Sequence, residues 1–317
     1  MVSEVWLHIG TPKSGTSSLQ KYFDTHRDVL AGQGLAYLCS PDRASANDLA
    51  VAWNRNRTEQ IAEQAGAINQ AINDRPEERA LISSEMFYGL PAAEIFEMLP
   101  ALADRPLKVL VYLRRQDRYI EAKFLQKSKN ARFIGSIQDF IAKFDGSGSD
   151  FAAHLATWTA CKGDVTLVPR VLERDRLEEG DVVCDVLTQI GLTGAPKPDT
   201  ADVNVTPGFH RVQLLQAASR AGIVPPRRLQ RLMAVHYPPN PSDRGPILGH
   251  AERKAFLDRY GVGNEALRAN FFPDWPSLFS MDDLDQPAVE TGVAPFTEAQ
   301  LYEITGMLKV MKQLIQS

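Results

Sequence analysis

The chain has 317 residues, 44% of them hydrophobic and 23% charged, and a formal net charge of −4. This composition is typical of a globular protein with a full hydrophobic core, and the length fits one α/β domain with insertions, over residues 1–317. The negative charge argues against bulk electrostatic binding of nucleic acid, although it leaves room for a local basic pocket.

Cysteines and apolar runs bear on the redox chemistry and the location of the chain. Cys39, Cys161 and Cys184 lie far apart without the CxxC spacing of a zinc site, so we expect buried free thiols and no metal. The first ten residues lack the basic segment and long apolar run of a signal peptide. No apolar stretch approaches the ~20 residues of a membrane span. These features predict a cytoplasmic protein.

Short apolar runs and helical stretches alternate through the first half of the chain. Such runs are typical of buried parallel strands, and alternation at this spacing predicts a three-layer α/β/α fold with a central, mostly parallel sheet. The strands are expected at residues 5–9, 80–83, 108–113 and 165–169, with a weaker candidate at 35–38, and the helices at 15–30, 43–73, 92–102, 116–129 and 150–162.

The second half is expected to be mostly helical, so the fold is one α/β domain with a helical C-terminal portion. Connectors rich in proline and glycine separate its segments, and FDGSGSD at 144–150 is expected to be a surface loop rather than a domain linker. The helices are predicted at 181–190, 208–221, 227–235, 251–260 and 298–315.

HIGTPKSGTSSLQ, residues 8–20, joins the first predicted strand to the first predicted helix. Such a junction gathers free backbone N–H groups and the positive end of a helix around one point, which favours an anion. Gly10 and Gly15 permit the turn, Lys13 adds a cation, and hydroxyl residues fill the first helical turn. A well-capped turn with a solvated lysine is the alternative.

The position of the lysine distinguishes this loop from the common phosphate-binding loop. A P-loop reads G-x-x-x-x-G-K-[ST], with lysine directly after the second glycine. Gly10 and Gly15 have that spacing, but Thr16 stands in the place of the lysine, and Lys13 precedes Gly15 by two positions. The mismatch favours a different anionic ligand.

TPKSGTSSL, residues 11–19, resembles the 5′-phosphosulfate-binding loop of bacterial sulfotransferases that use 3′-phosphoadenosine 5′-phosphosulfate (PAPS). The resemblance implies a P-loop-NTPase-like fold and transfer of a sulfuryl group from PAPS to a hydroxyl or amine acceptor, such as a carbohydrate or glycolipid, with 3′,5′-ADP as product. It implies that Lys13 stabilises charge on the leaving phosphate. The implied cofactor-binding residues are Pro12, Lys13, Ser14, Gly15, Thr16, Ser17, Ser18 and Arg114.

KVLVYLRRQDRYIEAKFLQ, residues 108–126, resembles the second signature of this family, a strand that ends in arginine before a helix with a serine. Arg114 ends the strand, and the resemblance implies that its guanidinium binds the 3′-phosphate. Ala122 replaces the serine. A hydrogen bond to a charged group contributes roughly 1.5–3 kcal/mol, so its loss would weaken cofactor binding by about one to two decades unless Lys123 or a neighbour substitutes.

Later segments resemble the family more loosely, so the resemblance spans most of the chain while residues 11–19 carry its most specific motif. These segments are VTLVPRVLERDRLEEGDVVCDVLTQIGL at 165–192 and NVTPGFHRVQLLQ at 204–216. Residues 227–228 and 244–245 are the candidates for the family's C-terminal R-K-G cofactor loop.

A general base is expected where the acceptor binds. Family members use a histidine or glutamate, and ALISSEMF places Glu85 after a predicted strand, at the sheet edge where open α/β sheets bind ligands. Alternatively, Glu85 caps a helix or pairs with a basic residue. His8 lies inside an apolar strand and is expected to be a core residue.

Two other functions stay open from the sequence. A P-loop kinase for a small molecule would need a carboxylate for magnesium, which Glu85 could supply. The second function that stays open is that of a catalytically silent relative that binds nucleotide or a partner. The replacement of the expected serine by Ala122 favours it.

Overall fold

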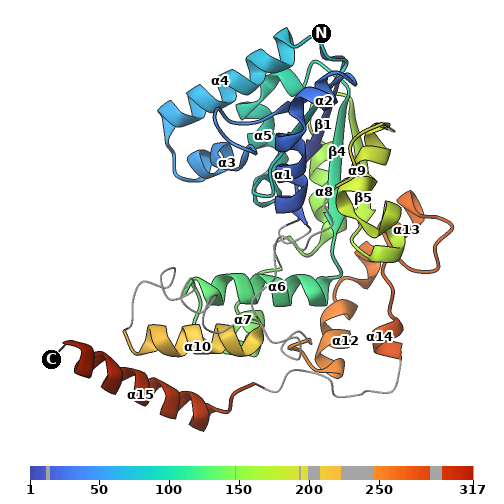
Figure 1. The fold of residues 1–317 in the computed structure, drawn as a ribbon. Coiled ribbons are helices and arrows are strands. Elements are labelled where there is room, and N and C mark those ends of the chain that lie inside the picture. The colour runs from blue at the N-terminus through green and yellow to red at the C-terminus, as the bar shows by residue number, and fades with distance from the viewer. Residues whose placement is uncertain are drawn as a thin grey trace. The chain divides into compact units, whose positions relative to one another are not determined.

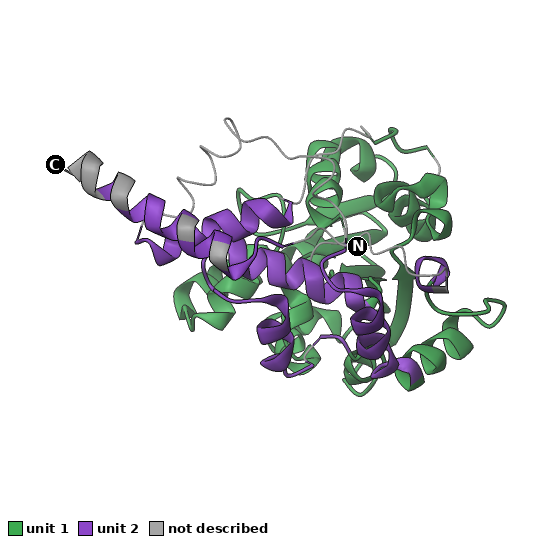
Figure 2. Cartoon of the chain, turned by 90° about the horizontal axis from the view of Figure 1, so that it is seen from below, with its two compact units in different colours: residues 1–115, 150–204, 262–279 green, residues 116–149, 205–261, 280–317 purple. Residues whose placement is uncertain are grey.

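The protein is described from a computed structural model. Contacts divide the chain into two compact units, shown in different colours in Figure 2. Unit 1 comprises residues 1–115, 150–204 and 262–279, and unit 2 comprises residues 116–149, 205–261 and 280–317. The single-domain expectation stays a prediction. The residues that the structure describes are 1–11, 15–146, 148–192, 194–198, 208–222, 246–285 and 295–316.

A five-stranded, all-parallel sheet forms the centre of unit 1 (Figure 1). Its order is β2-β3-β1-β4-β5, which places the first strand in the middle, between β3 and β4. Strands buried on both faces have nearly continuous apolar sequences, which is why they could be predicted from the sequence. The strands are β1 (Glu4–His8), β2 (Leu35–Leu38), β3 (Arg79–Ser83), β4 (Leu107–Leu113) and β5 (Val165–Val171).

Helices cover both faces of the sheet, so unit 1 is a three-layer α/β/α structure and the predicted fold class is confirmed. Successive strand residues point to opposite faces. Trp6 therefore packs in a cluster with α1 (Thr16–Thr25), α2 (Arg27–Ala31) and α9 (Val182–Ile190). Val5 and Leu7 pack in the opposite cluster with α3 (Asn47–Asn54), α4 (Thr58–Asp74), α5 (Ala92–Met98) and α8 (Phe151–Thr159).

Unit 2 is built from helices, with α6 (Gln116–Lys129) in contact with α7 (Ile137–Ala142), α10 (Phe209–Arg220) and α12 (His250–Asp258). Buried Asp117 pairs with Nε of Arg253 at 2.7 Å. The Glu121 carboxylate accepts hydrogen bonds from the backbone N–H groups of Ile247 and Leu248, both at 2.8 Å. These contacts attach α6 to the segment that leads into α12. Unit 2 also contains α14 (Asp282–Asp285) and α15 (Glu298–Gln316).

The predicted strands are confirmed, each end lying within two residues of its expected position. Three α-helices of the described residues were not predicted: α7 and α14 in unit 2, and α13 (Gly261–Phe271), most of which belongs to unit 1. The chain passes from unit 2 to unit 1 inside the expected surface loop at 144–150, between residues 149 and 150. The predicted helix at 227–235 lies outside the described residues.

The three cysteines are free thiols that are half-buried rather than fully buried as expected. Cys39 lies beside Arg27, whose Nη2 is 2.7 Å from the sulfur. Burial raises the pKa of the Cys39 thiol, while the guanidinium lowers it.

Candidate functional site

Three neighbouring strands of the sheet end around the start of α1. β1 pairs with β3 on one side and with β4 on the other, and His8 is in register with Ser83 and Leu110. Because the strands are parallel, their carboxyl ends lie at one edge of the sheet, where ligands bind in folds of this class. The loop after β1, Glu85 after β3 and Arg114 after β4 therefore all leave the sheet at the same edge.

Gly15 forms the N-terminal cap of α1 in the left-handed region, with φ of 79°. Its carbonyl accepts hydrogen bonds from the N–H groups of Ser18 and Leu19, and no described side chain caps the helix. The first N–H groups of a helix have no partner within the helix itself. This end of α1 can therefore donate backbone hydrogen bonds to an anion. A phosphosulfate fits that donor set.

The predicted loop residues differ in exposure. Pro12, Lys13 and Ser14 lie outside the described residues, so their assigned roles stay predictions. Thr16 is buried, whereas Ser17 is exposed and Ser18 is half-buried. Ser17 and Ser18 are thus the hydroxyl groups of this turn with access to a ligand.

Glu85 is half-buried and lies beside the first turn of α1. The Thr16 hydroxyl donates a hydrogen bond to Oε2 of Glu85 at 2.6 Å, which links residues 69 positions apart. Thr16 therefore contacts the carboxylate in this structure. The bond places the Glu85 carboxylate beside the loop that sequence analysis assigned to the cofactor.

The turn that carries Glu85 is held by its serine neighbour. The N–H of Ser84 donates to the carbonyl of His8 at 2.9 Å, and its hydroxyl donates to Oδ1 of Asn47 at 2.9 Å. The same hydroxyl oxygen accepts from the N–H of Met86 at 3.3 Å. Bonds on both sides of Glu85 restrict the backbone that presents its side chain.

His8 is fully buried directly before the loop. Its Nδ1 lies 2.9 Å from the Ser83 hydroxyl, while Nε2 is buried without a hydrogen-bond partner among the described residues. Burial lowers the pKa of His8 to about 4, because desolvation disfavours the imidazolium. His8 is therefore a neutral core residue at pH 7, as the sequence predicted.

Two arginines follow β4 and differ in burial. Arg114, the predicted 3′-phosphate ligand, is half-buried, whereas Arg115 is 2% exposed. No role was assigned to Arg115 from the sequence. Burial of so large a cation is unusual unless it is paired, so its burial distinguishes it from Arg114. Ala122, in unit 2, is a buried residue of α6, and its side chain has no hydroxyl to offer a phosphate.

A cavity of about 220 Å³ lies at the start of α1, in unit 1. Gly15 and Ser18 form part of its wall, and Arg174 and the start of α9 form another part. Arg174 lies in a short 3-10 helix, Arg174–Arg176, and is exposed. Sequence analysis did not assign Arg174. The available signal was its place in the 165–192 segment that resembles the family.

A buried ionic contact holds the segment around this cavity. Arg170 contacts both carboxylate oxygens of Asp185, at 2.9 and 2.6 Å, and the Tyr112 hydroxyl donates to Oδ2 of Asp185 at 2.8 Å. Bidentate contacts of this kind fix geometry as well as adding energy. They attach α9 to β4 and β5, so the cavity wall is anchored to the sheet.

Neither a metal cluster nor a membrane-spanning helix is found in the described parts of the chain. No group of three or more His, Cys, Asp or Glu residues there is arranged to hold a metal ion. No helix within the described ranges combines the length and apolar character needed to cross a bilayer.

Comparisons with known proteins give distant similarities. No family model matches the sequence. An uncharacterized protein of Archaeoglobus fulgidus is 24% identical over 210 residues, covering 61% of this chain and 53% of that protein. This chain therefore matches about half the length of that relative.

Two solved structures are also similar to the chain. One is a sulfotransferase from Alicyclobacillus acidocaldarius, with 16% identity over 76% of this chain and 98% of that one, at a TM-score of 0.41. The other is mouse sulfotransferase SULT7A1 complexed with PAP, with 15% identity over 62% of this chain and 61% of that one, at a TM-score of 0.34. Neither likeness is strong enough to carry a functional conclusion.

Proposed function

We propose that the protein is a sulfotransferase that moves a sulfuryl group from PAPS to a hydroxyl or amine acceptor. The observation that carries the proposal is the place of the motif TPKSGTSSL, residues 11–19. It follows the central strand of a parallel sheet and leads into α1, whose start no described side chain caps. An anion site at that position needs backbone donors, glycine and a cation, and this stretch contains all three.

The residues around the motif suit the two ends of the nucleotide. The start of α1, with Ser17 and Ser18, would bind the 5′-phosphosulfate. Arg114, at the end of the neighbouring strand, would bind the 3′-phosphate, since a guanidinium matches phosphate oxygens bidentately. Without a serine at position 122, we expect weaker binding of the 3′-phosphate than in a site that has one.

The chemistry assigned to this chain's residues is charge stabilisation and proton transfer. PAPS supplies the activated sulfuryl group. Lys13 would stabilise negative charge as the bond between sulfur and the bridging phosphate oxygen breaks. Glu85 would accept the proton of the acceptor hydroxyl or amine as the new bond to sulfur forms. A carboxylate held at 2.6 Å from the Thr16 hydroxyl, as Glu85 is, lies beside the phosphosulfate loop and supports this role.

A small-molecule kinase is the second candidate, and the contact between Thr16 and Glu85 favours it. A hydroxyl in the first turn of a helix and a nearby carboxylate are the kinds of groups that hold magnesium in nucleoside-triphosphate enzymes. The lysine placed before rather than after Gly15 favours the sulfotransferase.

Calorimetry with 3′,5′-ADP, PAPS and magnesium-ATP distinguishes these functions. We expect 3′,5′-ADP and PAPS to bind and magnesium-ATP not to compete with them. Binding of magnesium-ATP alone would establish the kinase instead, and binding of none of the three would end both proposals. Tight binding without turnover of PAPS over a panel of hydroxyl and amine acceptors would indicate the catalytically silent relative.

The assigned role of Lys13 is tested by Lys13→Ala, with Lys21→Ala as the matched control. Lys21 is an exposed residue of α1 outside the motif. We expect Lys13→Ala to abolish sulfuryl transfer from radiolabelled PAPS while the melting temperature stays unchanged. The control should keep wild-type turnover. Retained transfer in Lys13→Ala would show that another group stabilises the leaving phosphate.

A further inference from the structure

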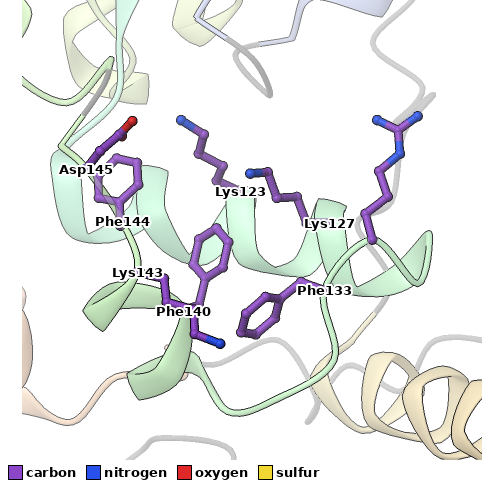
Figure 3. A pocket seen from close by; sticks show the side chains of 8 residues that line it. Lys123, Lys127, Phe133, Phe140, Lys143, Phe144 and Asp145 are labelled. Atoms are coloured by element: carbon purple, nitrogen blue, oxygen red, sulfur yellow. The ribbon is translucent and has the colours of Figure 1, made fainter.

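Unit 2 contains a basic pocket, and Lys123 is the residue of it that has been considered above for another role, as a substitute for a serine at position 122. It has a volume of about 220 Å³ and lies between α6, α7 and the chain that follows each helix. Figure 3 shows Lys123 and Lys127 projecting from α6 to the same side, with phenyl rings beside them. The residues that form this pocket are Lys123, Lys127, Arg132, Phe133, Phe140, Lys143, Phe144 and Asp145.

Aromatic rings form a continuous apolar surface in this pocket. Phe133 and Phe140 meet edge to face at 5.1 Å between centroids, and Phe140 stacks on Phe144 at 6.4 Å. Phe140 is buried, whereas Phe133 and Phe144 are half-buried and keep part of their surface open. Packed against one another, these rings offer apolar surface to a ligand that enters.

Cations outnumber carboxylates around these rings. Four cationic side chains line the pocket and Asp145 is its single acidic one, although the whole chain carries a net charge of −4. Two other acids nearby are engaged elsewhere. Asp139 forms a capping box with Ser136 at the start of α7, and Glu121 accepts two backbone hydrogen bonds. The pocket is therefore strongly positive in a protein that is negative overall.

Lys123 is a cation of this pocket whose charged form is disfavoured by burial and by its neighbour Lys127. Burial, and after it the charge of Lys127, lowers the pKa of Lys123, while Asp145 acts in the opposite direction. Its Nζ lies 4.8 Å from the centroid of the Phe144 ring, a cation–π contact that favours the ammonium, whereas the like charge of Lys127 four residues further along the helix repels it. The helix dipole favours Lys127 in the last turn of α6 and Lys143 at the C-terminal cap of α7, but it does not account for Lys123.

We propose that this pocket binds a sugar ring that carries sulfate or carboxylate groups. Several cations around one small space match a ligand with several anionic oxygens, and the C–H faces of a sugar suit exposed phenyl surface. The volume lies below the roughly 300–1,000 Å³ of pockets that enclose drug-sized molecules, which indicates one ring rather than a longer chain. The pocket consists of residues of unit 2 alone, so the proposal does not rest on PAPS binding.

Calorimetry on the full chain tests the proposal with a heparin-derived disaccharide that carries sulfate and uronate groups. Maltose and inorganic sulfate, at the same ionic strength, are the comparison ligands. We expect the acidic disaccharide to bind, roughly tenfold or more tightly than inorganic sulfate, and maltose not to bind. Equal affinity for inorganic sulfate would overturn recognition of the sugar, and no binding of the disaccharide would overturn the proposal as a whole.

A double variant and a matched control connect the binding to the pocket. Lys127→Met with Lys143→Met removes two exposed cations of the pocket and should weaken the affinity for the disaccharide by about tenfold. Lys254→Met removes an exposed lysine of α12 that does not line the pocket, and should change the affinity by less than about twofold. Equal weakening in the two variants would mean diffuse attraction and would overturn the site.

Competition separates this pocket from the nucleotide site. We expect saturating 3′,5′-ADP to leave the disaccharide affinity unchanged. Displacement by 3′,5′-ADP would assign the pocket to the nucleotide and overturn the proposal. Failure of 3′,5′-ADP to bind at all would count against the proposed function and leave the disaccharide result intact.

Discussion

Gly15→Ala is expected to destabilise the protein at the loop on which the proposed function depends. Gly15 has a φ of 79°, which residues with a Cβ rarely adopt, and it begins α1. A Cβ added there would lie 3.3 Å from Cγ2 of Val182, at the start of α9. The substitution thus adds both backbone strain and a close contact.

We expect the left-handed backbone conformation to account for most of the loss in free energy of unfolding that Gly15→Ala causes. The left-handed conformation costs a non-glycine residue roughly 1–2 kcal/mol. Alanine offsets about 0.4–1 kcal/mol of this through a less flexible unfolded chain. The contact with Val182 needs a shift of only a few tenths of an ångström. We therefore expect the free energy of unfolding to fall by about 1 kcal/mol, and coupling to Val182→Ala to stay below about 0.5 kcal/mol.

Urea unfolding of the wild type, Gly15→Ala, Val182→Ala and the double variant measures both the cost of the backbone strain and the cost of the contact with Val182. Gly66→Ala is the matched control, because Gly66 is an exposed residue inside α4 and a Cβ there meets nothing within 4 Å. Alanine should stabilise that helix by roughly 0.5–1 kcal/mol. Wild-type stability in Gly15→Ala would refute the reasoning from φ, and full rescue by Val182→Ala would assign the cost to the contact.

Two further predictions concern the buried His8 with the half-buried His154, and the assigned base. Burial lowers the pKa values of His8 and His154 to about 4, so the unfolded chain binds more protons between about pH 6.5 and 4 and the free energy of unfolding falls as the pH is lowered through that window. Urea unfolding should show a shallower fall in His154→Phe, and an unchanged slope would contradict the linkage. Glu85→Gln can still accept the Thr16 hydrogen bond but cannot take a proton, so sulfuryl transfer should fall by about 100-fold or more, with 3′,5′-ADP affinity retained. Wild-type turnover in that variant would remove Glu85 as the base, while Thr16→Val tests the hydrogen bond alone.

The sheet was predictable because each strand carries its own signal. The runs that became β1 and β4 are mostly apolar and, apart from Glu4 and Lys108, buried on both faces, so their sequence alone indicates a covered parallel sheet. Helix α6 was predicted with the bounds that it has. α7 was missed although Ser136 and Asp139 have the spacing of a capping box, because the helix is only six residues long.

The candidate site was predictable in part. The prediction that residues 10–18 bind an anion rests on neighbours in sequence, since glycine, lysine and hydroxyl residues occur together within one turn. The bond from Thr16 to Glu85 could not be foreseen, because the two residues are 69 positions apart and meet only when β1 and β3 pair. The same holds for Arg174, which reaches the cavity beside Gly15 through the packing of α9.

The fold class and the predicted anion-binding loop can thus be inferred from the sequence, since apolar runs, glycine turns and helix starts depend on residues close together in the chain. Long-range packing places the other groups. It buries His8 and Arg115 and brings Glu85 to the first turn of α1. It also places the lysines of α6 beside the phenyl rings of Phe133, Phe140 and Phe144. Those arrangements arise because burial of apolar surface brings distant segments together, and no sequence spacing encodes which charged groups then become neighbours.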